Sequence, residues 1–271
     1  MTEIINKKVP AVARIALIEE CNKLLAQQPV PRSFTTSTGA QLPIDKDELN
    51  AAIMGPGIAG FDVSMSKRSK RIVKSTYMYA DLVALLKFPE AKQKEQRYEE
   101  FMRLMKLTGW FVFSAPYNKY QSSSQKLTMD NVALSILHTA VTAAVSKGAA
   151  AVKVLSTVAD ATMEALKNEP EALRLFENNS KKAEGGNFCM SSALEDADGD
   201  ITMAIAAVQY VAKAQPTKVL FVEWSTSNVE IYNAAATMHM EEQDYLDVEP
   251  LIVKALAENR QKALSYEFGA A

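Results

Sequence analysis

The most reactive side chains of this 271-residue sequence are two cysteines and two histidines. Cys189 stands near the start of a predicted strand, directly after the flexible run Gly185–Phe188. A cysteine thiolate in such a setting is a nucleophile and an acceptor for acyl groups, whereas a buried cysteine packs as a small hydrophobe. Cys21 falls within a predicted helix, where we expect it to pack. His138 and His239 have no partners at the spacing of a zinc site, so the sequence predicts no metal centre.

Two short motifs are similar in sequence to ligand-binding loops. Residues Gly55–Gly60 match G-x-G-x-x-G, but a predicted helix precedes them and Pro56 lacks the amide that a phosphate would need, so we expect a loop that ends a helix. The carboxylates of Asp196–Asp200 suit calcium, yet EF-hand spacing would put Ile205 where a bidentate glutamate belongs. An Asp-Gly pair between two alternating runs predicts a hairpin instead.

With no nucleophile elbow or P-loop, the sequence predicts a protein that is not an enzyme and has no cofactor.

Five basic side chains gather at the start of another predicted helix, although the net charge of the chain is −2. Each basic residue beside an anionic bilayer contributes about 1 kcal/mol, so the cluster is a candidate for contact with anionic lipid. A solvated helix face is the alternative and the more usual role of such a run. Few aromatic residues interleave with these charges, so we expect no binding to nucleic acid. The basic cluster consists of Lys67, Arg68, Lys70, Arg71 and Lys74.

The segment Leu127–Leu166 is rich in alanine, valine and leucine. It predicts two apolar helices, Met129–Ser146 and Ala149–Asn168. The longest charge-free run, Asn131–Ser146, has 16 residues, fewer than the ~20 that cross a bilayer. We therefore expect the helix pair to cover a sheet. No secretory signal is visible at the N-terminus, so we expect a chain that is made in the cytoplasm and is exported by a non-Sec route or associates with membranes.

The order of the predicted elements indicates an α/β protein of the α+β type, a single domain over residues 1–271 with a mostly antiparallel sheet wrapped by helical layers. Besides the apolar pair, we expect helices at Val9–Gln27, Asp45–Met54, Ser66–Leu86, Pro89–Leu107 and Glu241–Tyr266. We expect strands in Gly109–Tyr120, Arg174–Phe176 and the alternating run Lys218–Tyr232. The predicted regions are an N-terminal helix and extended arm (1–45), helices (46–107), a first strand region (108–126), the apolar helix pair (127–168), the main β block (186–240) and a C-terminal helix (241–266).

This layout resembles that of the Cyt-type cytolytic toxins. The helices that lie across the sheet of that fold are similar to NVALSILHTAVTAAVSKGAAAVKVLSTVADA, and its long late strands are similar to KVLFVEWSTSNVEIYNAAATMHM. The chain also resembles the Evf virulence-factor family of bacteria, in the segments GFDVSMSKRSKRIVKSTYMYADLVALLKF, TGWFVFSAPYNKY and GNFCMSSAL. That family is associated with colonisation of an insect gut and includes a protein with a fatty acid held as a thioester on a cysteine. The resemblance places such a thioester on Cys189.

Three functions stay open at this point. The first is a non-enzymatic virulence factor that carries a fatty acid such as palmitate on Cys189, packed against the helices between Met129 and Leu166, and that associates with membranes. The second is a pore-forming cytolysin of the Cyt type, in which the helices leave the sheet and the long strands insert. The third is a thiol-dependent acyl-transfer enzyme, which would need a general base beside Cys189. The expected partners are a lipid membrane or a fatty acyl chain, and the sequence does not identify a host target.

Overall fold

Three long strands form the centre of the sheet. In order of pairing they are β7 (Gly185–Glu195), β8 (Ile201–Ala212) and β10 (Val229–Met240), joined by antiparallel ladders. Both faces of these strands are mostly buried. This explains why apolar residues do not alternate with polar ones along them. The computed structural model describes residues 9–27, 49–90, 93–114, 116–142, 148–182, 185–212, 218–259 and 265–270.

Shorter strands extend this centre on both sides. A hairpin of β1 and β2 lies beside β7, with β2 parallel to β7 and every other pairing antiparallel. The C-terminal strand β11 pairs with β1, so the order across the sheet is β11-β1-β2-β7-β8-β10-β3. Two further short strands pair with this sheet, β4 with β10 and β6 with β7, while β5 and β9 pair with each other separately. The bounds of the shorter strands are β1 Leu49–Met54, β2 Gly57–Phe61, β3 Trp110–Ser114, β4 Asn118–Lys119, β5 Lys126–Leu127, β6 Lys181–Lys182, β9 Trp224–Ser225 and β11 Ser265–Ala270.

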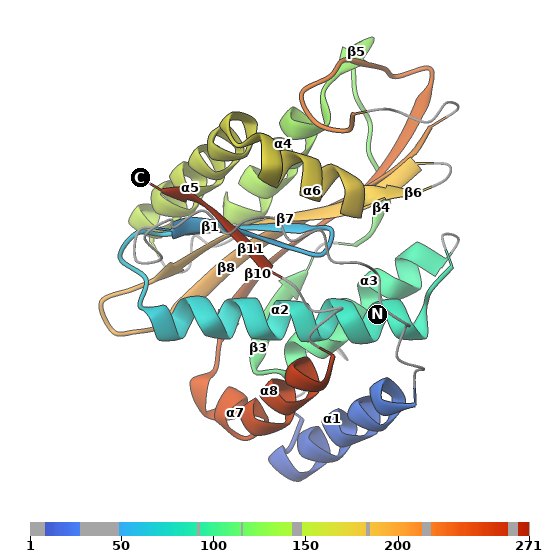
Figure 1. The fold of residues 1–271 in the computed structure, drawn as a ribbon. Coiled ribbons are helices and arrows are strands. Elements are labelled where there is room, and N and C mark those ends of the chain that lie inside the picture. Colours follow the sequence, from blue (N-terminus) through green and yellow to red (C-terminus); the bar gives the residue numbers. More distant parts are fainter. Residues whose placement is uncertain are drawn as a thin grey trace.

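Helices cover both faces of the sheet (Figure 1). On one face, α4, α5 and α6 enclose one core cluster, whereas α2 and α3 enclose a second cluster on the opposite face. Outside α2 lies a further layer of α1, α7 and α8, in which α8 contacts both α1 and α2. The helices span Ala11–Ala26 (α1), Lys67–Lys87 (α2), Lys94–Leu107 (α3), Met129–Thr142 (α4), Ala149–Asn168 (α5), Pro170–Ser180 (α6), Glu242–Leu246 (α7) and Glu249–Glu258 (α8).

The structure confirms the α+β class and several of the predicted elements. The first helix, the two amphipathic helices α2 and α3 and the apolar pair α4 and α5 lie where the sequence predicts them. The Asp-Gly hairpin also forms, because Gly199 adopts a φ of +88° and the amides of Asp198 and Asp200 both donate to Asp196 Oδ1. The described helices include none that is long and apolar enough to cross a bilayer. The extended arm predicted after the first helix, within residues 1–45, falls outside the described residues.

The helix predicted at Asp45–Met54 is wrong, and the predicted helical region 46–107 therefore contains a strand hairpin before α2 and α3. Leu49–Met54 forms β1, and the Gly55-Pro56 pair is the turn of a hairpin in which Met54 faces Gly57. Gly55 has a φ of +56°, as the first position of a type II′ turn requires. An isolated helix of such length is marginal in water, so pairing with β2 and β11 outweighs the helical propensity of alanine and methionine.

The predictions for two other segments are also wrong. The helix predicted over Glu241–Tyr266 ends at Glu258 in α8, and β11 follows at the edge of the sheet. The strand predicted at Arg174–Phe176 lies inside α6, whose first turn holds Pro170. Proline favours that position because its ring presets a helical φ and its missing amide would have had no partner there.

Residues 218–223 do not form the strand that their apolar sequence predicts. Phe221 has a φ of +56°, which no strand residue adopts, and the chain is irregular until β9. The amide of Val219 donates to Glu177 Oε1 at 2.9 Å, and its carbonyl accepts from Trp224 Nε1 at 3.1 Å. Val219 and Leu220 are still buried, so the apolar run marks a core-filling loop.

Candidate functional site: a pocket at Cys189

Cys189 lies in the middle of the sheet, on β7, and its side chain points toward α2 and α3. Successive residues of a strand face opposite sides. Phe188 and Met190 accordingly pack into the core under α4, α5 and α6, whereas Cys189 packs against the core under α2 and α3. The neighbours of Cys189 across the sheet are small, Gly57 on β2 and Ala207 on β8. Small neighbours leave space above the sulfur, and a pocket occupies it.

The pocket is small, and both aromatic and polar side chains line it. It has a volume of about 60 Å³, enough for a few water molecules at ~10–15 Å³ each. Tyr77 of α2 and Tyr98 and Phe101 of α3 form one side, and Tyr117, which precedes β4, forms another. The rings of Tyr77 and Phe101 meet edge to face, with centroids 5.1 Å apart. These contacts define a largely apolar chamber with a sulfur at its base.

Tyr77 reaches the sulfur across a glycine. Its hydroxyl donates a hydrogen bond to Cys189, and the ring is almost fully buried. A Cβ atom at residue 57 would lie 2.1 Å from Tyr77 Oη, so this approach requires glycine at that position. The amide of Cys189 donates to the carbonyl of Pro56 at 3.2 Å, which ties the strand to the β1–β2 turn.

Burial dominates the acid–base properties of the pocket. Desolvation raises the pKa of the Cys189 thiol to about 12, although the Tyr77 hydroxyl opposes this shift and the nearby Asp81 carboxylate adds to it. The residue has intermediate exposure because the side chain faces the pocket, yet the surrounding protein is dense enough to desolvate the sulfur. With such a pKa the thiolate fraction at pH 7 is about 10⁻⁵. The pocket therefore shelters the sulfur and does not activate it.

Polar side chains also line the chamber, among them Tyr98 and Arg97 of α3. Desolvation also raises the pKa of Tyr98, and its buried hydroxyl has no hydrogen-bond partner among the described residues. Arg97 donates to the carbonyls of Phe88 at 2.8 Å and Glu90 at 3.1 Å, which closes the loop before α3. A buried phenol without a partner is costly, so the Tyr98 hydroxyl is a candidate donor to a polar atom in the pocket.

The apolar helices α4 and α5 do not surround the sulfur. They lie on the far face of the sheet from Cys189, in the core that holds Phe188 and Met190. The prediction that an acyl chain on Cys189 packs between Met129 and Leu166 is therefore wrong. The sheet itself separates the two, and the walls of the pocket come from α2 and α3 instead.

Cys21 provides an internal comparison. It lies on α1, is 2% exposed and belongs to the core beside Tyr79. Burial raises the pKa of its thiol, while Lys87 and Arg103 oppose the shift. The expectation that Cys21 packs as a core residue agrees with this position.

The basic cluster lies at the beginning of α2, away from the Cys189 pocket. Much of its charge is already paired within the chain: Arg68 contacts Glu242, Lys74 contacts Glu267, and Lys67 also has a polar partner. Arg71 projects to solvent. Contact between the cluster and anionic lipid stays a prediction.

Sequence patterns missed the aromatic residues that enclose Cys189. Tyr77 and Asp81 are four residues apart, a spacing that places both on one face of α2, but nothing in the sequence indicates that this face meets β7. The described residues contain no group of three or more histidine, cysteine or acidic side chains that could hold a metal ion.

No family model matches the sequence, and no curated protein matches it. Among solved structures, the chain is similar to that of the Evf virulence factor, with a TM-score of 0.37 and 11% identity over 91% of this chain and 90% of the other. It is also similar to that of a delta-endotoxin, with a TM-score of 0.37 and 11% identity over 79% of this chain and 90% of the other. Both are distant likenesses.

Proposed function

We propose that the chain is a virulence-type protein that associates with membranes through a fatty acid held as a thioester on Cys189. The observation that supports this is the position of the sulfur at the base of a small pocket lined by aromatic and polar side chains. A thioester is neutral, so the desolvation that keeps the thiol protonated does not oppose it. The unpartnered Tyr98 hydroxyl is suited to donate to a thioester carbonyl. Virulence, with colonisation of an insect gut as its setting, follows the resemblance of the sequence to the Evf family.

The acylated protein needs a wider pocket than the one described. A volume of about 60 Å³ holds only the first atoms of an acyl chain. Each buried methylene contributes about 0.8 kcal/mol, so the 14 methylenes of a palmitoyl chain contribute roughly 11 kcal/mol if all are buried. The same chain inserted into a bilayer gives weak, reversible anchoring.

Acylation by exchange with an acyl thioester donor conserves atoms and charge. The sulfur of Cys189 attacks the acyl carbonyl, the new S–C bond forms, the C–S bond of the donor breaks, and the thiol proton passes to the departing donor thiolate. Because the closed pocket holds the thiol in its protonated form, we expect the exchange to occur while the pocket is open. The same raised pKa favours a carrier of a finished thioester over a thiol enzyme that turns over.

Intact mass spectrometry of the chain expressed in its native host tests the thioester. We expect an added acyl mass that neutral hydroxylamine removes. Cys189→Ser should lose the addition, whereas Cys21→Ser, the matched control, should keep it. An unmodified wild-type mass, or an addition that survives in Cys189→Ser, would contradict the proposal.

Vesicle assays test the membrane step separately. Acylated chain should sediment with neutral vesicles, and chain treated with hydroxylamine should stay in the supernatant. Rapid release of an entrapped dye would favour the pore-forming alternative. Acylated chain that stays in the supernatant would overturn membrane association while leaving the thioester in place.

A further inference from the structure

A groove lies at the end of the sheet farthest from β11, between the beginning of α2, α7 and the turn that joins β7 to β8. Two aromatic side chains of β3 line it, Phe111 at 39% exposure and Phe113 at 50%. Their rings meet edge to face with centroids 4.8 Å apart. The alternate residues of β3, Trp110 and Val112, are buried beneath α2 and α3. The exposed pair is thus the outer face of an end strand that no described helix covers.

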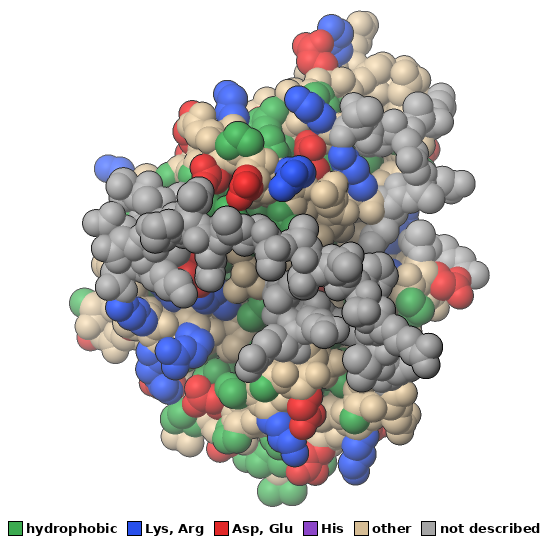
Figure 2. Space-filling view, viewed as in Figure 1, with side chains coloured by type: hydrophobic (Ala, Val, Ile, Leu, Met, Phe, Trp, Pro, Cys, Tyr) green, Lys and Arg blue, Asp and Glu red, His purple; other side chains and the backbone are tan. Residues whose placement is uncertain are grey.

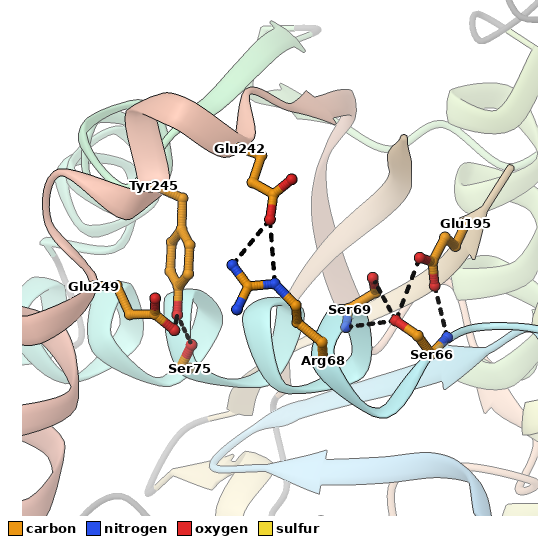
Figure 3. Close-up of polar contacts among 8 residues, drawn as sticks. All are labelled: Ser66, Arg68, Ser69, Ser75, Glu195, Glu242, Tyr245 and Glu249. Atoms are coloured by element: carbon orange, nitrogen blue, oxygen red, sulfur yellow. Dashed lines mark hydrogen bonds and ion pairs between the residues drawn. The ribbon is translucent and has the colours of Figure 1, made fainter. Parts of the chain in front are cut away.

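The walls of this groove are held by polar contacts (Figure 3). Ser66 caps α2 by accepting from the amide of Ser69 at 3.1 Å, and its own amide donates to Glu195 Oε2 at 2.6 Å. Arg68 donates to Glu242 Oε1 through Nε at 3.1 Å and Nη2 at 2.9 Å. These contacts join the start of α2 to the end of β7 and to α7. The three elements that form the groove are therefore held together by hydrogen bonds.

The groove is strongly acidic. Its lining contains five carboxylates and one guanidinium. The guanidinium of Arg68 is already paired with Glu242. Among the described residues, the carboxylates of Asp198 and Glu241 make no hydrogen bond or ion pair. These two exposed charges and the two phenylalanines are therefore available to a cationic surface that also carries apolar side chains.

Such a surface adjoins the groove on the same molecule. Arg71 is one helical turn beyond Arg68 and faces solvent, and within the described chain it has no hydrogen-bond or ion-pair partner. The loop before the helix exposes Val63 at 69%. Figure 2 shows basic side chains grouped over the beginning of α2. The acidic groove and this basic face are thus neighbours at the start of α2, with Arg68 at the groove and Arg71 one turn beyond it.

We propose that the groove binds the basic face of a second copy of this chain. Neighbouring patches of opposite charge on one surface suit a two-fold axis, because each copy then places its basic face on the groove of the other. In this arrangement Arg71 of each copy meets Asp198 and Glu241 of its partner, and Val63 covers the exposed phenylalanines. A metal ion is a poorer occupant, since the described residues offer no converging group of ligands. The inference does not depend on acylation of Cys189.

A charge exchange tests the contact. Sedimentation equilibrium over a concentration series at low salt should show a dimer of the 29.8-kDa chain, with a dissociation constant that rises with ionic strength. Arg71→Glu alone and Asp198→Lys alone should each raise that constant at least about tenfold, because each places like charges together. The double variant should return to within about threefold of wild type, because the attraction is restored with its signs reversed.

Controls separate this contact from folding and from lipid binding. Arg174→Glu makes the same charge change on α6, on the other side of the sheet, and should leave the dimer constant unchanged. Asp198→Lys keeps the β7–β8 turn, which Asp196 closes. A wild-type chain that is monomeric throughout the series would overturn the proposal. Reduced binding of Arg71→Glu to phosphatidylglycerol vesicles with an unchanged dimer constant would overturn it in favour of lipid contact.

Discussion

Tyr77 hydrogen-bonds to Cys189 only because residue 57 is a glycine. The phenol oxygen occupies the space of the absent side chain, which places a donor from α2 against a sulfur on β7. The absence of a Cβ atom at residue 57 thus lets the β1–β2 hairpin, α2 and the candidate site pack together.

Gly57→Ala should destabilise the protein by about 1–3 kcal/mol, the usual cost of overpacking a dense core. In a Tyr77→Phe background the same substitution should cost less, because the hydroxyl that lies nearest to the new methyl group is gone. Urea denaturation of the four proteins measures the coupling. Equal costs in both backgrounds would contradict the contact.

Alkylation of Cys189 should be slow and strongly pH-dependent. In a Cys21→Ser background, the rate with iodoacetamide, followed by mass spectrometry, should rise about tenfold per pH unit from pH 8 to 10, because burial raises the pKa of this thiol to about 12. Tyr77→Phe should slow the reaction at each pH, since losing the hydrogen bond to the thiolate raises the pKa further. A rate that levels off near pH 9 would show that burial does not raise the pKa of Cys189.

The same shift makes stability depend on pH. Between the unfolded pKa of 9.0 and the folded value of about 12, the folded chain keeps the Cys189 proton that the unfolded chain releases. Stability therefore falls as pH rises through this window, by at most about 1.4 kcal/mol per unit from this group. Between pH 9 and 10.5, Cys189→Ala should make the fall of the unfolding free energy with pH shallower by up to about 1.4 kcal/mol per pH unit, the contribution of one proton. Identical slopes in the two proteins would place the thiol in a solvated setting.

Arg14 should anchor α1. The guanidinium is buried, donates to the carbonyl of Asp244 at 2.7 Å and pairs with the carboxylates of Asp244 at 3.0 Å and Asp247 at 3.5 Å. Arg14→Ala should cost about 3–5 kcal/mol, because it leaves partly buried carboxylates without their cation. Lys23→Ala, an exposed change on the same helix, should cost less than about 0.5 kcal/mol. Chemical denaturation compares the two, and similar costs would contradict the anchor.

The turn at Asp196 should depend on hydrogen bonds and not on calcium. Its carboxylate accepts from two backbone amides, so Asp196→Ala should cost about 1 kcal/mol. Millimolar calcium should leave the melting temperature of the wild-type chain unchanged. A calcium-dependent rise that Asp196→Ala abolishes would restore the metal reading.

Elements governed by local chemistry could be predicted from the sequence. The apolar pair α4 and α5 follows from helical periodicity over many residues, and the β7–β8 hairpin follows from an Asp-Gly pair between alternating runs. The short strands β1 and β11 could not be predicted, because six residues carry little periodic signal and each strand depends on a partner from the far end of the chain. The irregular run 218–223 was misread for a related reason, since burial selects apolar residues in loops as well as in strands.

The candidate site could likewise be predicted from the sequence only in part. The sequence by itself indicated that Cys189 stands near the start of a strand, because it follows a glycine-rich run and an Asp-Gly turn comes after the strand. Which helices surround the sulfur was decided by the tertiary structure alone. Both faces of β7 are apolar, so alternation does not show which face meets α2 and α3 and which meets α4 and α5. The contact of Gly57, Tyr77 and Cys189 joins segments far apart in the chain, and only the packing of α2 on the sheet brings them together.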